Sequence, residues 1–182
     1  MTTSTHLNTL RRGSRFLAWL CLLAAIAWPL EKAAWMMRTP AADLFNTFSM
    51  QPSVSGPVSL KLWQRLLLVT LGVVPALAAS VGLWGLYRCF RLFAAGDFFS
   101  VRTVRWLRRC AGWTFCSLAL SLVAHPLVGL VMTATLPRGE QEVVFAFYRV
   151  HFETLLIAGT VWVISGAMAE AGRLADENAQ FV

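Results

Sequence analysis

The sequence is short of charged residues, and acidic side chains are the scarcer kind. Charged residues make up 14% of the 182 and hydrophobic residues 57%, with 16 Lys and Arg against nine Asp and Glu. A soluble domain carries about 25% charged residues. Four runs contain no charged residue at all: 16–30, 66–87, 110–137 and 154–169. Because a helix needs roughly 20 apolar residues to cross the hydrocarbon layer, this pattern excludes an ordinary soluble fold and indicates a membrane protein.

Catalytic signatures are also missing. There is no HExxH or GxSxG motif, no glycine-rich phosphate loop and no pair of carboxylates placed for a membrane cleft. His6, His125 and His151 lie far apart in the sequence, and none has a Ser or Cys partner at a recognised spacing. We therefore expect no enzymatic activity and no cofactor.

The apolar runs predict an all-α fold, an integral membrane bundle of four transmembrane helices. The expected segments are a tail (1–15), a first span (16–37), an outer loop (38–61), a second span (62–87), a basic loop (88–109), a third span (110–136), a second outer loop (137–145), a fourth span (146–170) and a tail (171–182). The first span continues past Glu31 and Lys32, since a lysine near the interface can extend its ammonium group to water.

A cleaved signal peptide is the alternative interpretation of the first apolar run. Arg11, Arg12 and Arg15 precede it as they would in such a signal. Pro29 and the apolar extension after it favour a retained helix instead.

Lysine and arginine are unevenly distributed between the two sides of the membrane. Ten of the 16 fall in the two tails and the 88–109 loop, and six fall on the opposite side. The positive-inside rule therefore predicts an N-in, C-in orientation, with both tails and the 88–109 loop in the cytoplasm.

The four cysteines favour neither a disulfide framework nor a metal site. Cys21 and Cys116 lie in predicted spans, Cys89 and Cys110 lie near the cytoplasmic boundary, and no CxxC motif occurs. We expect them to be small packing residues. No metal site is predicted, although four residues of the outer side could bind a cation with generic spacing: Glu140, Glu142, His151 and Glu153.

Two segments are expected to lack regular structure. Residues 1–14, rich in Thr, Ser, Asn and Arg, predict a short mobile tail. Residues 39–57 include Pro40, Pro52 and Pro57 and predict an outer loop. Its apolar part, 41–50, is expected to lie on the membrane surface.

The 87–113 segment predicts a helical hairpin with a basic face. Gly96 can end one helix in a left-handed conformation, and Ser100 can cap the next. At 100° per residue, Arg102, Arg105, Arg108 and Arg109 fall within one arc of about 120°. The basic face is expected to attract anionic lipid headgroups or an acidic protein partner, and direct nucleic-acid binding is not expected, because no recognition module is present.

The C-terminal segment carries an acidic stripe. Glu170, Arg173 and Glu177 are spaced to share one side of a helix. Our hypothesis is that this stripe neutralises the arginines of the central loop within the same protein.

Small and polar residues within the spans suggest how the helices pack. Pro75 and Pro126 are expected to shape packing by kinking their helices. His125 is expected to be packed and bonded to a neighbouring backbone carbonyl, and a transport site is the alternative. Small residues on the second and fourth spans allow neighbouring helices to approach closely, which predicts a compact bundle. They are Gly72, Ala76, Ala79, Gly82, Gly159, Ser165, Gly166 and Ala169.

Two stretches carry a resemblance to a known family. The segment from Leu92 to Arg109 and the terminal pattern of Glu170, Gly172, Leu174 and Glu177 resemble the domain of unknown function 2975 family, the YoaS-like bacterial four-span membrane proteins. The resemblance implies a multi-pass protein of the bacterial cytoplasmic (inner) membrane, often encoded beside a small helix-turn-helix regulator, and it implies no known activity.

The charge distribution and the resemblance together favour a regulatory or scaffold protein that presents its basic cytoplasmic face to a partner, such as that regulator. A small oligomeric transporter or channel subunit is the alternative, and a homo-oligomer is compatible with either.

Overall fold

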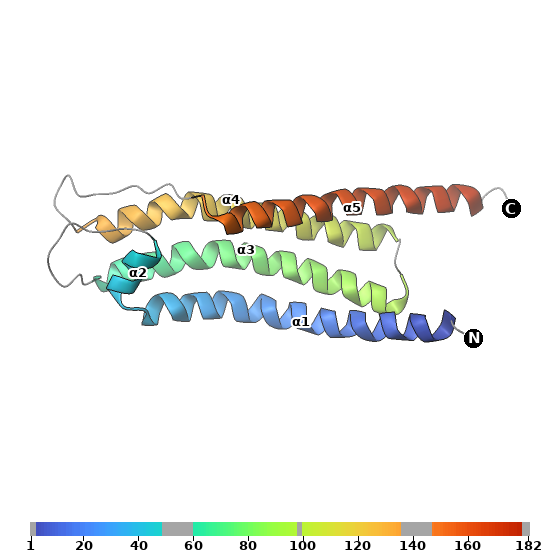
Figure 1. Ribbon diagram of the computed structural model, residues 1–182, viewed down its shortest axis with the longest axis horizontal. Coiled ribbons are helices and arrows are strands. Elements are labelled where there is room, and N and C mark those ends of the chain that lie inside the picture. The colour runs from blue at the N-terminus through green and yellow to red at the C-terminus, as the bar shows by residue number, and fades with distance from the viewer. Residues whose placement is uncertain (1–2, 49–59, 98–99, 136–146, 180–182) are drawn as a thin grey trace.

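The computed structural model describes residues 3–48, 60–97, 100–135 and 147–179, and all the regular structure in these ranges is helical. The helices are α1 (Thr3–Arg38), α2 (Ala41–Thr47), α3 (Leu62–Ala95), α4 (Val101–Thr133) and α5 (Arg149–Ala179) (Figure 1). All except α2 are long and apolar enough to cross a membrane. The expected all-α fold with four membrane-spanning helices is confirmed, and the orientation across the membrane stays a prediction.

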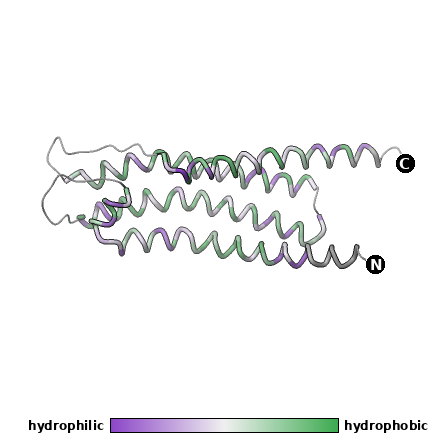
Figure 2. Tube along the Cα trace, in the orientation of Figure 1, coloured by the Kyte–Doolittle hydropathy of each residue, from purple (hydrophilic) through white to green (hydrophobic). Residues whose placement is uncertain are grey.

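The long helices exceed the thickness of the hydrocarbon layer. A helix of 34 residues such as α3 is about 50 Å long, against about 30 Å of hydrocarbon. Both chain ends and the turn between α3 and α4 lie at the same end of the molecule (Figure 1). Hydrophilic stretches lie toward both ends of the molecule, and at this end they include the last turns of α5 (Figure 2). We call it the basic end, and the opposite one the α2 end.

The expected mobile N-terminal tail is instead helical. Helix α1 begins at Thr3 and runs without a break to Arg38. Within residues 3–14, Gly13 disfavours helix most, by about 1 kcal/mol, and each Thr, Ser or Asn costs less, which does not stop a helix that continues into an apolar span.

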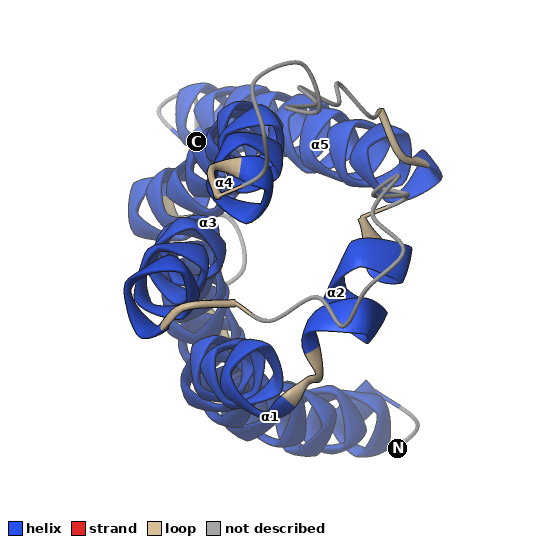
Figure 3. Ribbon diagram, turned by 90° about the vertical axis from the view of Figure 1, so that its left-hand side faces the viewer, coloured by secondary structure: helices blue, strands red, loops and turns tan. Residues whose placement is uncertain are grey.

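Within the helix bundle, the long helices form a curved row (Figure 3). Helix α1 packs against α3, α3 against α4, and α4 against α5. A Cβ atom on Gly72 would lie 2.6 Å from Met36 Sδ of α1, and one on Gly85 would lie 3.3 Å from the Trp106 carbonyl oxygen of α4. A Cβ on Gly159 or Gly166 of α5 would meet nothing within 4 Å. The glycines of α3 therefore serve packing, whereas Gly159 and Gly166 of α5 have open space beside them, and Ser165 of α5 is fully buried.

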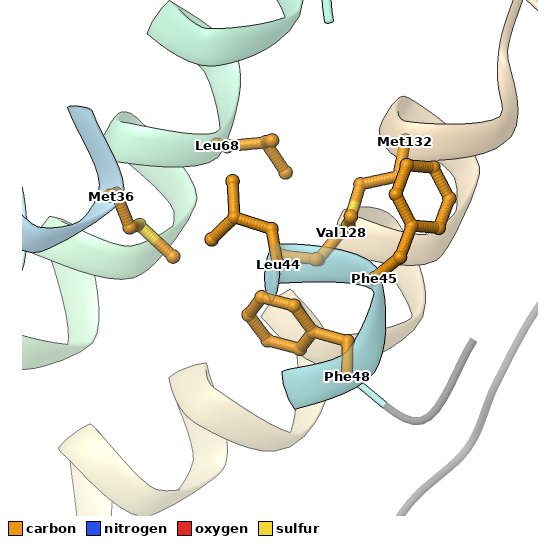
Figure 4. Close-up of a cluster of buried hydrophobic side chains, with 7 residues drawn as sticks. All are labelled: Met36, Leu44, Phe45, Phe48, Leu68, Val128 and Met132. Carbon is orange, nitrogen blue, oxygen red and sulfur yellow. The ribbon is translucent and has the colours of Figure 1, made fainter. Parts of the chain in front are cut away.

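Helix α2 corrects the expectation that residues 41–50 lie on the membrane surface. Leu44, Phe45 and Phe48 are at most 8% exposed. They pack into a cluster contributed by four helices (Figure 4): Met36, Leu44, Phe45, Phe48, Leu68, Val128 and Met132. Burial of each large apolar side chain contributes about 1.5–3 kcal/mol, so burying three of them favours folding α2 back onto the row of helices.

Polar side chains link the helices to one another at the α2 end. Gln64 is fully buried; its Oε1 accepts from the Lys61 amide at 2.9 Å, and its Nε2 donates to the Val131 carbonyl of α4 at 2.8 Å. Arg65 donates to the carbonyl of Met37 at 2.8 Å, at the C-terminus of α1. These bonds satisfy backbone groups that the helix ends leave without partners.

The predicted turn at the basic end is confirmed. Gly96 has φ 91°, in the left-handed region, and its amide donates to the Phe93 carbonyl. Ser100 Oγ accepts from the Thr103 amide at 3.3 Å. All four cysteines are free thiols.

Candidate functional site

The concave side of the row encloses a cavity of about 620 Å³ toward the α2 end. All five helices line it, with apolar side chains along α3 and α4. We call it the polar cavity, because it also contains titratable and hydroxyl groups: Lys32, Ser121, His125, Tyr148, Arg149 and His151.

Two histidines from different helices meet in the polar cavity. The ring centroids of His125 on α4 and His151 on α5 are 5.5 Å apart, with the rings nearly perpendicular. Tyr148 lies against both, 5.1 Å from His125 and 5.8 Å from His151. Ser121 Oγ lies 3.4 Å from His151 Nε2. This group of four side chains brings most of the polar chemistry of the cavity together.

The neighbours of each imidazole determine where its protons lie. The Tyr148 amide donates to His151 Nδ1 at 3.2 Å, so Nδ1 carries no proton, and Nε2 holds the proton and donates to Ser121 Oγ. His125 Nδ1 lies 3.2 Å from the Ser121 carbonyl oxygen, which only accepts, so this nitrogen is protonated. His151 is therefore neutral, and His125 keeps Nε2 for another partner.

The first turn of α5 explains why His151 points inward. His151 follows Tyr148 by three residues, and its ring accepts from the amide that precedes the helix, as Glu or Gln does in a capping box. Burial to 5% exposure accompanies this bond. The helix start and the cavity therefore depend on the same side chain.

Two further groups give the cavity its polarity. Lys32 Nζ lies 5.0 Å from the centroid of the Trp35 ring, a cation–π contact that keeps the ammonium group beside the cavity. Tyr148 Oη is buried, and no hydrogen-bond partner is found for it within the described part of the chain.

The sequence singled out His125 but not its neighbours. The predicted bond to a backbone carbonyl is confirmed by the Ser121 contact. His151 was placed with outer-side carboxylates, yet Glu153 forms an ion pair with Arg149 at 2.6 Å on an exposed face, while His151 turns inward. Glu140 and Glu142 lie outside the described residues.

The arginines of α4 are exposed, as the sequence predicts. Arg102, Arg105, Arg108 and Arg109 all face away from the row, whereas Thr103, Val104 and Leu107 are buried against it. Arg109 lies 5.0 Å from the centroid of the Trp106 ring. None of the four forms an ion pair within residues 3–48, 60–97, 100–135 and 147–179.

The acidic stripe of α5 does not reach those arginines. Arg173 pairs with Glu170 at 2.5 Å and with Glu177 at 3.3 Å, and all three side chains are exposed. The two described carboxylates are thus occupied on their own helix, which contradicts the hypothesis that they neutralise the α4 arginines.

A second hollow lies beside the basic end, between α1 and α3. It encloses about 460 Å³, and Arg15, Trp19, Tyr87 and Arg91 are among its lining residues. Arg11 also approaches this end, since its Nη2 would lie 3.2 Å from a Cβ on Gly96. The positive charge of this end therefore extends from α4 across to α1.

Comparison with known proteins identifies one family. The model of the family described as "Protein of unknown function (DUF2975)" matches residues 19–182, nearly the whole chain, which confirms the resemblance carried by residues 92–109 and by the C-terminal pattern. No curated protein and no solved structure matches the chain.

Proposed function

The chain belongs to the DUF2975 family, and from this premise we propose that it is a regulatory or scaffold protein of the bacterial cytoplasmic membrane. Its basic end faces the cytoplasm and binds an acidic surface of a cytoplasmic partner. The small helix-turn-helix regulator that the family resemblance leads us to expect is the first candidate. We assign the protein no catalytic role and no cofactor.

The observation that carries this proposal is the exposed positive charge of α4. Four arginines project from one face, and the described carboxylates nearest the C-terminus are engaged with Arg173 instead. A cluster of like charges repels itself unless counter-charges come from outside the molecule. An acidic partner would supply them.

The position of the arginines along the helix favours a soluble partner over lipid for two of them. The charge-free run of α4 begins at Cys110, and Arg102 precedes it by eight residues, about 12 Å of helix. The headgroup layer on each side is roughly 5 to 7 Å thick. On this geometry, Arg108 and Arg109 lie within the headgroup layer, whereas Arg102 and Arg105 lie at the outer edge of that layer or beyond it.

The test is a pull-down of the intact tagged protein from mild detergent. The double variant Arg102→Gln/Arg105→Gln is compared with Arg38→Gln/Lys61→Gln, which removes the same charge from exposed residues at the α2 end. Glutamine removes charge without reversing it, and a reporter fused to the C-terminus verifies that topology is retained. We expect about tenfold weaker partner binding for the first variant alone, since an exposed ion pair contributes up to about 1 kcal/mol.

Two further outcomes define the role of the arginines. Arg102→Lys/Arg105→Lys should retain the partner if charge alone is recognised. If no partner is captured by any variant, while anionic vesicles bind the wild type and not the glutamine variant, the basic end serves lipid only and the proposed partner is wrong.

The polar cavity favours a second candidate function, that of a small transporter or channel subunit acting as an oligomer. His125 keeps one ring nitrogen for another partner inside the spanning region, which is the arrangement a proton pathway needs. Proton flux into proteoliposomes, measured with a pH-sensitive dye, should fall on His125→Ala. An unchanged flux would contradict a transport role for His125.

A further inference from the structure

Exposed side chains from both ends of the helix row line the polar cavity. Its walls include α1 and α5, which lie on opposite sides of the concave side, with α2 between them at the α2 end (Figure 3). Trp28 of α1 and Val150 of α5 both line it and are 57% and 56% exposed. These exposed lining residues on membrane-spanning helices make the bilayer the natural source of a ligand.

The cavity is amphipathic and carries charge of one sign. Leu71, Ala76 and Leu118 belong to its apolar wall along α3 and α4. Lys32 and Arg149 are its charged lining residues, and no carboxylate lines it within the described part of the chain. Because Arg149 pairs with Glu153 on an exposed face, Lys32 is the cation left for a ligand. A cation beside apolar walls favours a ligand that combines a negative headgroup with a hydrocarbon tail.

Polar groups without partners gather at the same place. The Tyr148 hydroxyl is buried with no acceptor among the described residues, a state that costs about 1–3 kcal/mol. His125 Nε2 likewise has no hydrogen-bond partner there, since its described polar contact uses Nδ1. An acceptor oxygen of a ligand would satisfy the hydroxyl, and His125 Nε2 would accept from a hydroxyl group of the same headgroup.

We propose that the polar cavity is a binding site for a membrane lipid with an anionic headgroup. Lys32 and Tyr148 hold the phosphate or carboxylate, His125 Nε2 accepts from a headgroup hydroxyl, and the acyl chain lies along the apolar wall of α3 and α4. The site is separate from the basic end and does not depend on the function proposed for it.

The test uses the full chain in nanodiscs of zwitterionic lipid, doped with a photoactivatable phosphatidic acid that carries a diazirine in its acyl chain. The matched probe is the phosphatidylcholine with the same chain. Cross-linked peptides are mapped by mass spectrometry. We expect the anionic probe to label residues of the cavity wall on α3 and α4 and to be competed by unlabelled phosphatidic acid.

Three single variants make the test specific. Lys32→Gln should lower labelling about tenfold, because a hydrogen bond to a charged group is lost, and Lys32→Arg should restore it. Tyr148→Phe should lower labelling similarly, while the melting temperature of the lipid-free protein stays level or rises, since no partner of the hydroxyl is removed. Arg38→Gln, an exposed cation at the same end but outside the cavity, should leave labelling unchanged.

Several results would overturn the proposal. Equal labelling by the phosphatidylcholine probe, or an equal loss on Arg38→Gln, would mean nonspecific lipid contact. Full protection by millimolar inorganic phosphate would identify a site for the free anion rather than a lipid. The variant Arg102→Gln/Arg105→Gln should retain full labelling, so failure of the partner proposal and failure of this one are distinguishable.

Discussion

Polar side chains at the α2 end and at the basic end of this protein differ in burial and in bonding. At the α2 end, Gln64 is fully buried, and both the oxygen and the nitrogen of its side-chain amide are hydrogen-bonded. His151 is 5% exposed, and both of its ring nitrogens are hydrogen-bonded. At the basic end, Arg102 and Arg105 are exposed and form no ion pair within the described residues. The chain itself therefore satisfies Gln64 and His151, whereas Arg102 and Arg105 are left for something outside it.

This difference predicts where substitutions are costly. Substituting a buried residue at the α2 end removes packing contacts and hydrogen bonds that are shielded from water. Substituting an exposed charge at the basic end removes only interactions that solvent screens. Stability should therefore be sensitive at one end, and binding at the other.

The largest effect is expected in the core beneath α2. Leu44→Ala should lower the free energy of unfolding by about 2–5 kcal/mol, because Leu44 is 1% exposed within a packed cluster. Leu62→Ala, at the same end but 69% exposed, is the control and should change little. Thermal unfolding in detergent measures both. An equal, small effect of the two would mean that α2 is not packed on the row.

Glycine substitutions sharpen the contrast between packed and open helix faces. Gly85→Ala should destabilise by about 1–3 kcal/mol, because its Cβ would meet the Trp106 backbone oxygen at 3.3 Å. Gly159→Ala has open space and should be neutral or stabilising by up to about 1 kcal/mol, since alanine favours helix. A loss at Gly159 in the melting temperature would show that α5 is covered on that face.

The cap at the basic end should have a smaller, local effect. Ser100→Ala removes the acceptor of the Thr103 amide and should cost about 1 kcal/mol, whereas Ser100→Asp keeps an oxygen there and should be tolerated. Hydrogen exchange of the first amides of α4 reports the change directly. Faster exchange in both variants would contradict capping by the side-chain oxygen.

The smallest effect is expected in the acidic stripe. Glu177→Lys should leave the melting temperature in detergent unchanged, because its pair with Arg173 is exposed and lies within one helix. The control is Gln64→Ala, which should lower the melting temperature because it leaves the Val131 carbonyl without its donor. A clear loss on Glu177→Lys would revive the idea that this stripe neutralises the α4 arginines.

Features that depend on neighbouring residues could be predicted from the sequence. Gly96 and Ser100 bound the turn as expected because left-handed backbone and helix capping are properties of a few consecutive residues. The outward face of Arg102, Arg105 and Arg109 follows from helix periodicity alone. One of the four side chains of the candidate site could be predicted in the same way, since His125 is a polar residue in an apolar run.

Features that depend on distant residues were missed or predicted wrongly. The apolar residues of 41–47 would suit either the membrane surface or the protein core. Their packing against Met36, Leu68 and Val128 places them in the core, and this contact cannot be predicted from the segment alone. The glycines of α3 and α5 look alike in sequence, yet only those of α3 approach another helix.

The sequence by itself therefore determined the number of spanning helices, the α3–α4 turn and the exposure of the α4 arginines, because apolar length, capping and periodicity are local free energies. Only the tertiary structure decided that the helices form an open row, that α2 closes one end, and that His125, Tyr148 and His151 meet in one cavity. In lipid, apolar burial does not distinguish one helix partner from another. The choice depends on close packing and interhelical hydrogen bonds, which exist only once the helices are in place.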